Sequence, residues 1–525
     1  MRSAPIPNHS LSALKALQTL STALSAGLHP LKWWEIEFSG SPPENRRPLL
    51  NEMAVILAQD MHGVSNFAKG LDVNKAKHPA EFESILFDFL LPLHVALTQR
   101  GSWDEALNLE LIIYSAYIKQ DEDHDFYERA FAKLYSPYAT TQKEAADPAN
   151  LAHSSKTASI TSSDNATLFW FQNYSILAHT QLVLNLAEFL PIEAKFYASA
   201  LSNIDLQKSQ SIFTQAGIEI LEIDDRQSLA SRCHELIKLC KRHGIKNIVM
   251  VSLPLQSGYL KGICDGIDLT WWSMKYPLGC MPHFDRLVCN RTLYPTQKVF
   301  HGALWLCAPF ALKALMPQQL DTTGTDLKVG VLAREEKFAS SQLPEILNQC
   351  LVKQPNLQIF WTGRREDPDL VARLEGPSLL DLRQRIHFAG WVDPALFLTK
   401  VDLLVDTPNL GGTVAYWAMS MGKVVISATN SGSVGALGSH NELQAHFHLL
   451  TSAEEIRDYF HSESPLPYYL SSAELIPLCL IRYADQKELL KKHGQRFLHF
   501  FSNALSDMDR WSEVTYLMLT GSKLK

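Results

Sequence analysis

The chain has 525 residues, more than one hydrophobic core usually serves, so we expect about two or three domains. Its composition is that of an ordinary globular protein, with 46% hydrophobic residues, 20% charged residues and a formal net charge of −7. This balance excludes the strongly basic character of proteins that bind nucleic acid or anionic membranes, and we expect no nucleic-acid partner.

The eight cysteines form no C-x-x-C pair and no His/Cys spacing that suits zinc, so we interpret them as reduced, mostly buried thiols. The N-terminal stretch breaks its apolar residues with Lys15, Gln18 and several Ser and Thr, which is not typical of a signal peptide. The longest apolar stretches, residues 84–97 and 300–316, are interrupted by Asp, His or Pro. Neither predicts a membrane span, and we expect a cytoplasmic protein with no integral membrane segment.

Residues 1–150 are predicted to form an all-helical N-terminal domain, because helical periodicity runs through most of this part of the chain. One segment illustrates the pattern with apolar residues that share a helical face: Ala106, Leu109, Ile113 and Tyr117.

The small, polar and Ser/Thr-rich residues 139–166 mark a linker or a long surface loop. After it, short β-branched or aromatic runs alternate with amphipathic helices, and the alternation starts again after a polar break at 321–326. Such alternation predicts parallel sheets with helices on both faces. We therefore expect an α/β protein with an N-terminal Rossmann-like domain over 167–320, a C-terminal Rossmann-like domain over 321–475 and closing helices over 476–525.

The segment VDLLVDTPNLGGTVAYWAMSMGKVVIS, residues 401–427, predicts a strand, a turn, a helix and a second strand. Asn409, Gly411 and Gly412 lie in the turn, and Thr413 opens the helix. Glycines let a phosphate approach the backbone, and a helix N-terminus favours its negative charge. A plain strand-to-helix turn also uses Gly for its geometry, and no standard phosphate-binding motif is present, so these residues alone leave both interpretations open.

Two cations follow the first strand of the same domain, in VGVLAREEKFAS. Arg334 and Lys337 should therefore lie at the same edge of the sheet as the glycine turn, where a cation can neutralise a diphosphate without a metal ion. A solvated surface lysine is the alternative for Lys337. No D-x-D motif appears in this segment or in residues 401–427, so we expect no metal site.

Three segments, residues 269–290, 332–363 and 401–427, together resemble eukaryotic O-GlcNAc transferase. The overall domain plan of the chain is more similar to that of the bacterial high-molecular-weight-adhesin glycosyltransferases, a family of cytoplasmic N-glucosyltransferases. The resemblance covers roughly residues 167–460. It implies a GT-B fold, in which two Rossmann-like domains face each other behind an all-helical N-terminal domain.

The resemblance also implies the roles of individual residues. Lys337 matches the lysine that holds the donor diphosphate, and Gly411, Gly412 and Thr413 match the turn and helix start that receive the phosphates. Gly363 and Arg364 match a loop beside the nucleotide. Gly390, Trp391 and Val392 lie where the family holds the base.

On the acceptor side, SILAHTQLV resembles the histidine-containing strand-to-helix turn of the family, which makes His179 the candidate active-site histidine. The residues alone do not distinguish it from a structural histidine, and His283 is a second candidate for the catalytic base. Trp417 stands where the family has an acidic residue for the ribose, so the indole would either stack on a ring or fill space beside Tyr416 and Met421.

Together these observations predict an inverting, metal-independent glycosyltransferase that uses a nucleotide-sugar, UDP-glucose or a related UDP-hexose, as substrate and needs no cofactor. The acceptor would be a protein or peptide, with adhesins and flagellins as candidates. Two alternatives remain open: a nucleotide-sugar epimerase of the same two-domain plan, and a non-catalytic protein-binding relative.

Overall fold

The computed structural model describes most of the chain, and the statements below concern these residues. Apart from a few isolated residues between them, the described ranges are 11–25, 43–59, 86–114, 124–143, 166–176, 178–189, 194–273, 283–290, 293–300, 302–309, 325–332, 342–362, 382–390, 392–406, 413–428 and 444–520.

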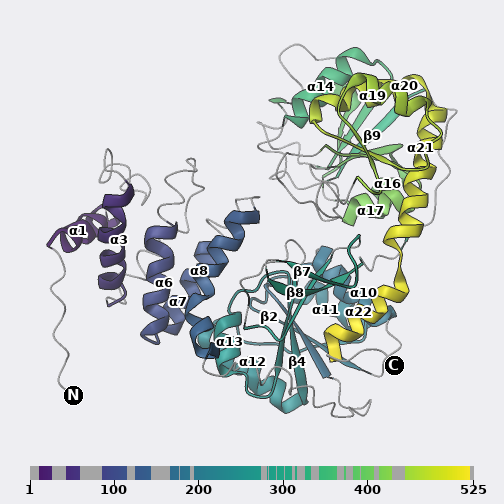
Figure 1. Cartoon of the computed structure of the whole chain (residues 1–525). Helices are drawn as coiled ribbons and strands as arrows, with labels where there is room; N and C mark the ends of the chain where they lie inside the picture. Colours follow the sequence, from purple (N-terminus) through teal and green to yellow (C-terminus); the bar gives the residue numbers. More distant parts are fainter. Residues whose placement is uncertain are drawn as a thin grey trace, which may run out of the picture.

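The N-terminal part is helical wherever the structure describes it (Figure 1). Its elements are α1 (Leu11–Ser25), α3 (Pro43–Leu57), the π-helix Leu86–Leu90, α6 (Leu91–Gln99), α7 (Trp103–Ile112) and α8 (His124–Lys143). The apolar face predicted for α7 is confirmed at Ala106, Leu109 and Ile113, which are buried, whereas Tyr117 lies outside the described residues.

The next domain is built on sheet A, which has eight described strands in the order β3-β2-β1-β4-β5-β6-β8-β7. The strands are β1 (Ala166–Phe171), β2 (Lys195–Ala200), β3 (Ile218–Ile220), β4 (Ile245–Val251), β5 (Asp268–Ser273), β6 (Arg286–Asn290), β7 (Gln297–Phe300) and β8 (Ala303–Ala308). Neighbours pair in parallel, except that β7 and β8 form an antiparallel hairpin that the sequence did not predict.

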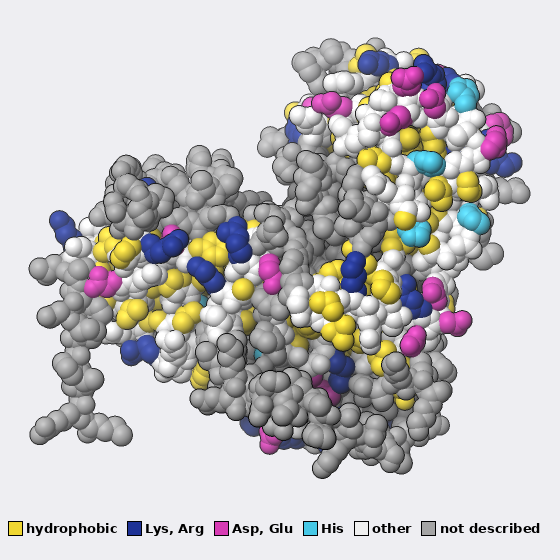
Figure 2. Space-filling view, in the orientation of Figure 1, with side chains coloured by type: hydrophobic (Ala, Val, Ile, Leu, Met, Phe, Trp, Pro, Cys, Tyr) yellow, Lys and Arg dark blue, Asp and Glu magenta, His cyan; other side chains and the backbone are white. Residues whose placement is uncertain are grey.

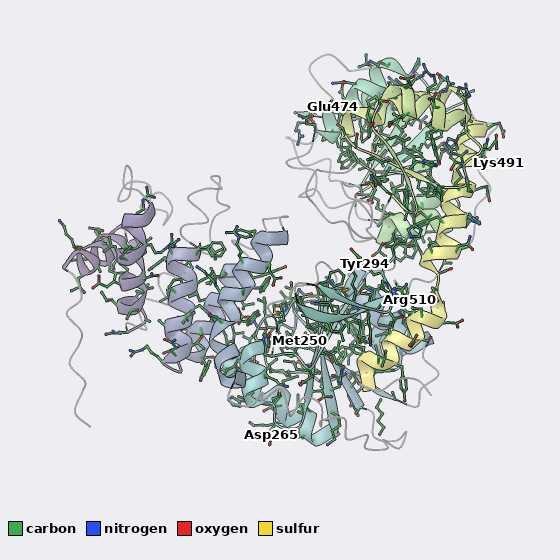
Figure 3. All side chains as sticks on the ribbon, viewed as in Figure 1. Met250, Asp265, Tyr294, Glu474, Lys491 and Arg510 are labelled. Carbon is green, nitrogen blue, oxygen red and sulfur yellow. The ribbon has the colours of Figure 1, made fainter. Side chains whose placement is uncertain are left out.

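Helices cover both faces of sheet A because side chains alternate along its buried strands. Phe169 and Phe171 of β1 belong to the core shared with α10 (Ala178–Phe189) and α11 (Leu206–Gln215). Leu168 and Trp170 belong to the opposite core, with α12 (Leu229–His243), α13 (Ser257–Ile263) and the N-terminal helices. The helical part and sheet A therefore share one apolar core; Met250 lies on that side of β4 (Figure 3).

The C-terminal domain is built on sheet B, whose five described strands run parallel in the order β11-β10-β9-β12-β13. The strands are β9 (Leu327–Val331), β10 (Leu357–Trp361), β11 (Ile386–Phe388), β12 (Leu403–Val405) and β13 (Val424–Ile426). Between them lie α14 (Leu343–Lys353), the 3-10 helix Leu382–Arg385, α16 (Pro394–Thr399) and α17 (Thr413–Ser420). A small parallel pair is formed by β14 (His448–Leu450) and β15 (Tyr468–Leu470). Helix α19 (Ala453–His461) lies between these two strands in the chain.

The C-terminal helices contact both Rossmann-like domains. The 3-10 helix Ala473–Leu475, α20 (Ile476–Asp485) and α21 (Lys487–Phe500) pack on the sheet B domain, and the π-helix Phe501–Leu505 leads into α22 (Met508–Thr520). Helix α22 returns to sheet A, where Asn247 Nδ2 donates to the Met518 carbonyl at 3.3 Å. Arg510 donates to the Cys307 carbonyl at 3.1 Å from the same helix (Figures 1 and 3).

The predicted fold class is confirmed: sheets A and B form two Rossmann-like domains behind an all-helical N-terminal part. On the face that Figure 2 shows, acidic and basic side chains mix over the sheet B domain, while Lys and Arg side chains lie among hydrophobic ones over the helical part. Among the described helices, none combines the length and apolarity needed to span a lipid bilayer.

One close approach holds α21 to the turn before β13. Gly422 adopts a left-handed conformation, with φ of 74°, and a Cβ added at Gly494 would overlap the Gly422 carbonyl oxygen. We expect Gly494→Ala to lower stability by about 1 to 3 kcal/mol, since the backbones must separate.

Thermal denaturation checks this expectation against Gly262→Ala, because a Cβ at this position of α13 would meet nothing within 4 Å. Equal melting temperatures for the two variants would contradict the close packing described here.

Candidate functional site

The strand order of sheet B reverses between β9 and β12. The chain starts at β9, adds β10 and β11 on one side, and then adds β12 and β13 on the other. β12 pairs directly with β9, with Leu403 opposite Val329 and Leu404 opposite Gly330. Ligands of open parallel sheets bind outside the carboxyl ends of the strands at such a reversal. Sheet B therefore has one candidate ligand position, beyond Val331 and Val405.

The predicted donor residues belong to segments that begin at this edge of sheet B. Arg334 and Lys337 follow β9, while Asn409, Gly411 and Gly412 follow β12, the neighbouring strand. Further along the same edge, Gly363 and Arg364 follow β10 and Trp391 follows β11. These eight residues lie outside the described residues, so their side-chain roles stay predictions: Arg334, Lys337, Gly363, Arg364, Trp391, Asn409, Gly411 and Gly412.

Among the residues predicted to bind the diphosphate, Thr413 is the one that the structure describes. It is the first residue of α17, and its side chain is largely buried. Asp406, at the end of β12, is also buried, and its backbone N–H donates to the Ile426 carbonyl at 2.9 Å. The sequence did not single out Asp406, although a carboxylate directly after a buried strand is a recognisable signal. The edge thus presents a buried Thr and a buried carboxyl group on either side of the glycine turn.

Trp417 packs against the apolar core of the sheet B domain and is half-buried. Its neighbours Tyr416 and Met421 are buried in the same core, and the Trp417 carbonyl accepts a hydrogen bond from Ser420 Oγ at 2.8 Å. This environment favours the space-filling interpretation of the indole. An indole N–H can only donate, so this position offers no acceptor for ribose hydroxyls.

The turn after β11 is fixed on both sides of the undescribed Trp391. Ala389 N–H donates to the Trp361 carbonyl at 2.8 Å, and Gly390 adopts φ of 64°, a left-handed value that favours glycine. After the turn, the Asp393 carboxylate caps α16 by accepting from Leu396 N–H at 2.9 Å. Backbone groups here are held in place at the carboxyl edge, where the sequence predicts contacts with the base.

Sheet A has a reversal of its own, between β1 and β4. His179 lies in the first turn of α10, directly after β1, and is half-buried. The turn is tied to the rest of the domain: Thr180 Oγ1 donates to the Ser175 carbonyl at 2.8 Å, and Ser175 Oγ donates to Asp205 Oδ2 at 2.7 Å. His179 therefore stands at the carboxyl edge of sheet A on a fixed turn, with part of its side chain accessible.

His283, the second candidate base, is enclosed between sheet A and the helical part. Its ring is 1% exposed, lies 4.9 Å from the Tyr135 ring, and has Nε2 2.7 Å from Ser257 Oγ. Burial, with a smaller effect of Lys261, lowers its pKa to about 3. Of the two histidines, His179 is the one that a substrate can reach.

The remaining ligand-forming side chains give no sign of a metal centre. In the part of the chain that the structure describes, no three His, Cys, Asp or Glu side chains gather as a metal site requires. The seven cysteines in that part are free and buried, as predicted. Burial raises the pKa of the Cys240 and Cys350 thiols to about 12, so they are unreactive at neutral pH.

No family model and no curated protein matches the sequence. Solved structures that resemble it include HepE of Anabaena in complex with UDP and glucose, with 12% identity, 68% of this chain and 100% of that chain covered, and a TM-score of 0.47. An O-GlcNAc transferase mutant of Thermobaculum terrenum has 13% identity, 98% and 99% coverage, and a TM-score of 0.45. A glycosyltransferase of Rickettsia africae has 11% identity, 68% and 100% coverage, and a TM-score of 0.47. Similarities at this level decide nothing about activity, which must be argued from the sites.

The environment of His283 predicts that this residue stays neutral. Because its pKa is lowered to about 3, the unfolded chain takes up the proton first as the pH falls below 6.5, and acid should favour unfolding through this group. Histidine NMR on the native protein should show no titration of the His283 ring between pH 5 and 8.

The NMR resonance of the His283 ring is identified by its absence from the spectrum of the His283→Gln variant. A titration midpoint near the ordinary histidine value for that resonance would contradict the enclosed position.

Proposed function

We propose that the protein is an inverting, metal-independent glycosyltransferase that transfers a hexose from a UDP-linked donor to a protein or peptide acceptor. One observation carries the proposal: the segments with Lys337 and with the Gly411-Gly412-Thr413 turn begin at β9 and β12, which are neighbours where sheet B reverses. A diphosphate at this position lies between two cations and a helix N-terminus.

The donor diphosphate is bound by groups of opposite charge and by free backbone N–H groups. Arg334 and Lys337 supply positive charge from one side, and the N-terminus of α17 supplies its dipole and N–H groups from the other. The base is held by the backbone around Gly390, since Trp417 packs in the core and offers the ribose no carboxylate.

The reaction is a single displacement at the anomeric carbon. An acceptor oxygen or amide nitrogen forms the new bond to this carbon while the bond to the diphosphate oxygen breaks on the opposite face, which inverts the configuration. Lys337 and the α17 N-terminus stabilise the charge that develops on the diphosphate, and loss of such a donor costs roughly 3 kcal/mol of barrier. His179, accessible at the edge of sheet A, takes the proton of the acceptor.

The acceptor approaches from the sheet A side. In Figure 1, α17 lies on the side of its domain that is turned toward sheet A. The helical part shares its core with α12 and α13 of sheet A, which makes it part of the acceptor-side body. Candidate acceptors are surface proteins such as adhesins and flagellins.

Replacing Lys337 with Ala should weaken the binding of UDP by about 2 to 3 kcal/mol, because the diphosphate loses a charged hydrogen-bond partner. Isothermal titration calorimetry measures the change. Lys328→Ala is the matched control, since Lys328 is an exposed lysine at the amino end of the same strand, β9. Equal affinities in the parent and in Lys337→Ala would remove Lys337 from the site.

Transfer should persist in the presence of EDTA, because protein groups neutralise the diphosphate. The measurement is mass spectrometry of an acceptor protein incubated with UDP-glucose, with and without the chelator. Loss of transfer with EDTA and its recovery with Mg²⁺ or Mn²⁺ would contradict the metal-independent mechanism.

The same reaction without an acceptor distinguishes the alternatives. An epimerase of this two-domain plan would convert the UDP-sugar itself, and a non-catalytic relative would leave both compounds unchanged.

A further inference from the structure

A polar cluster lies inside the apolar core that joins the helical part to sheet A. Glu110 of α7 is 1% exposed, and Tyr135 of α8 is equally buried. Both contact the loop that follows β4, residues 252–257, at the carboxyl edge of sheet A where the strand order reverses. We call Glu110, Tyr135, Pro254 and Gln256 the Glu110 cluster.

The hydrogen bonds of the Glu110 cluster are short and connect two parts of the fold. Tyr135 Oη lies 2.7 Å from Glu110 Oε1 and also 2.7 Å from the Pro254 carbonyl oxygen. Gln256 N–H donates to the same Oε1 at 3.0 Å. Ser252 and Gln256 both adopt left-handed conformations, with φ of 73° and 63°, which non-glycine residues adopt only when their surroundings hold them. The cluster therefore holds the loop in a conformation that it would not keep alone.

The number of hydrogens in the Glu110 cluster depends on the state of the carboxyl group. A tyrosine hydroxyl carries one hydrogen, whereas a carbonyl and an ionised carboxylate only accept. If Glu110 is ionised, Tyr135 can donate to Glu110 or to Pro254 but not to both, and one buried 2.7 Å contact joins two oxygens without a hydrogen. If Glu110 is protonated, its O–H donates to Tyr135 Oη, and the Tyr135 O–H donates to Pro254. The neutral acid satisfies both contacts.

We infer that Glu110 is a neutral carboxylic acid in the assembled structure, and that its ionisation loosens the attachment of the loop 252–257 to the helical part. The Glu110 cluster is thus a pH-sensitive connection between the helices and the edge of sheet A. This inference does not depend on the proposed transfer reaction.

The pKa of the Glu110 carboxyl group is determined by its burial and its hydrogen bonds. Among the described residues, no Lys or Arg forms an ion pair with it, and burial raises its pKa to about 7 against the opposing effect of the hydrogen bonds from Tyr135 and Gln256. Besides Tyr135 in the cluster itself, the titratable groups around it are Asp104 on α7, Arg232, Cys233 and His234 on α12, Tyr259 on α13, and His283 with Lys261 behind it.

Two of these neighbours stay neutral across the range in which Glu110 ionises. Burial, and then the charge of Glu110, raises the pKa of the Cys233 thiol far above its ordinary value. Burial lowers the pKa of His283 to about 3, so this ring carries no positive charge that could stabilise the carboxylate. Neither of these two neighbours therefore offsets the charge that Glu110 gains as the pH passes through neutrality.

The direction of the pH dependence follows from the raised pKa. The folded-state value of about 7 lies above the ordinary value of 4.5, so the contribution of Glu110 to stability is complete below pH 4.5 and is lost as the pH rises through 7. A pKa shift of this size changes the equilibrium constant for detachment of the loop 252–257 by on the order of a hundredfold.

Hydrogen exchange of the full-length protein tests the inference. Between pH 5.5 and 8.5, after correction for the intrinsic exchange rate, protection of residues 252–257 should fall by about thirtyfold and level off above pH 7. Glu110→Gln should remove this pH dependence because the amide does not ionise. Glu105→Gln is the matched control, since Glu105 lies on the same helix outside the cluster, and it should behave as the parent does. The same pH dependence in Glu110→Gln as in the parent would overturn the inference.

Infrared spectroscopy of the unmodified protein decides the matter if Glu110→Gln does not fold. The difference spectrum between pH 6 and 8.5 should contain a carboxylic acid band that disappears with a midpoint near 7. The absence of such a band would show that Glu110 is already ionised and would overturn the inference.

Discussion

The parallel pairing of β12 with β9 is the constraint on which the candidate donor site depends. In the strand order of sheet B, β10 with β11 and β12 with β13 lie on opposite sides of β9. The segments that leave β9 and β12 thus start side by side, although roughly seventy residues separate them in the chain. Sheet A repeats this arrangement at β1 and β4, which gives each domain one edge position at which a ligand can bind.

The C-terminal helices connect the two domains that carry these edge positions. Helix α21 packs on sheet B, and after a π-helix α22 packs on sheet A, where its carbonyl groups accept from Asn247. The connection is short, and its apolar residues continue the core of both domains. On the opposite face of sheet A, the N-terminal helices complete a second core, which encloses the carboxyl group of Glu110. Each domain is therefore fixed by contacts from distant parts of the chain.

Local patterns predicted β1 to β6, the strands of sheet B and the start of α17 at Thr413, because buried strands and helix starts are encoded by neighbouring residues. The β7–β8 hairpin was missed, since an apolar run broken by His301 and Pro309 has no clear period of its own. Glu110 occupies the helical spacing of the buried face of α7, four residues after Ala106, but only the tertiary structure shows that Tyr135 and the loop after β4 enclose it. Motifs indicated which segments would bind a donor, and this stays a prediction, because the side-chain geometry of these segments depends on contacts that no local pattern specifies.

The proposed function requires that a nucleoside diphosphate binds where the strand order of sheet B reverses. Hydrogen exchange of the full-length protein with and without saturating UDP tests it most directly, because the method reports on the segments after each strand separately. We expect added protection in residues 332–342 and 406–420, which follow β9 and β12, and no change at the amino ends of the same strands. Saturable UDP binding that protects neither segment, or that protects the amino ends instead, would contradict it.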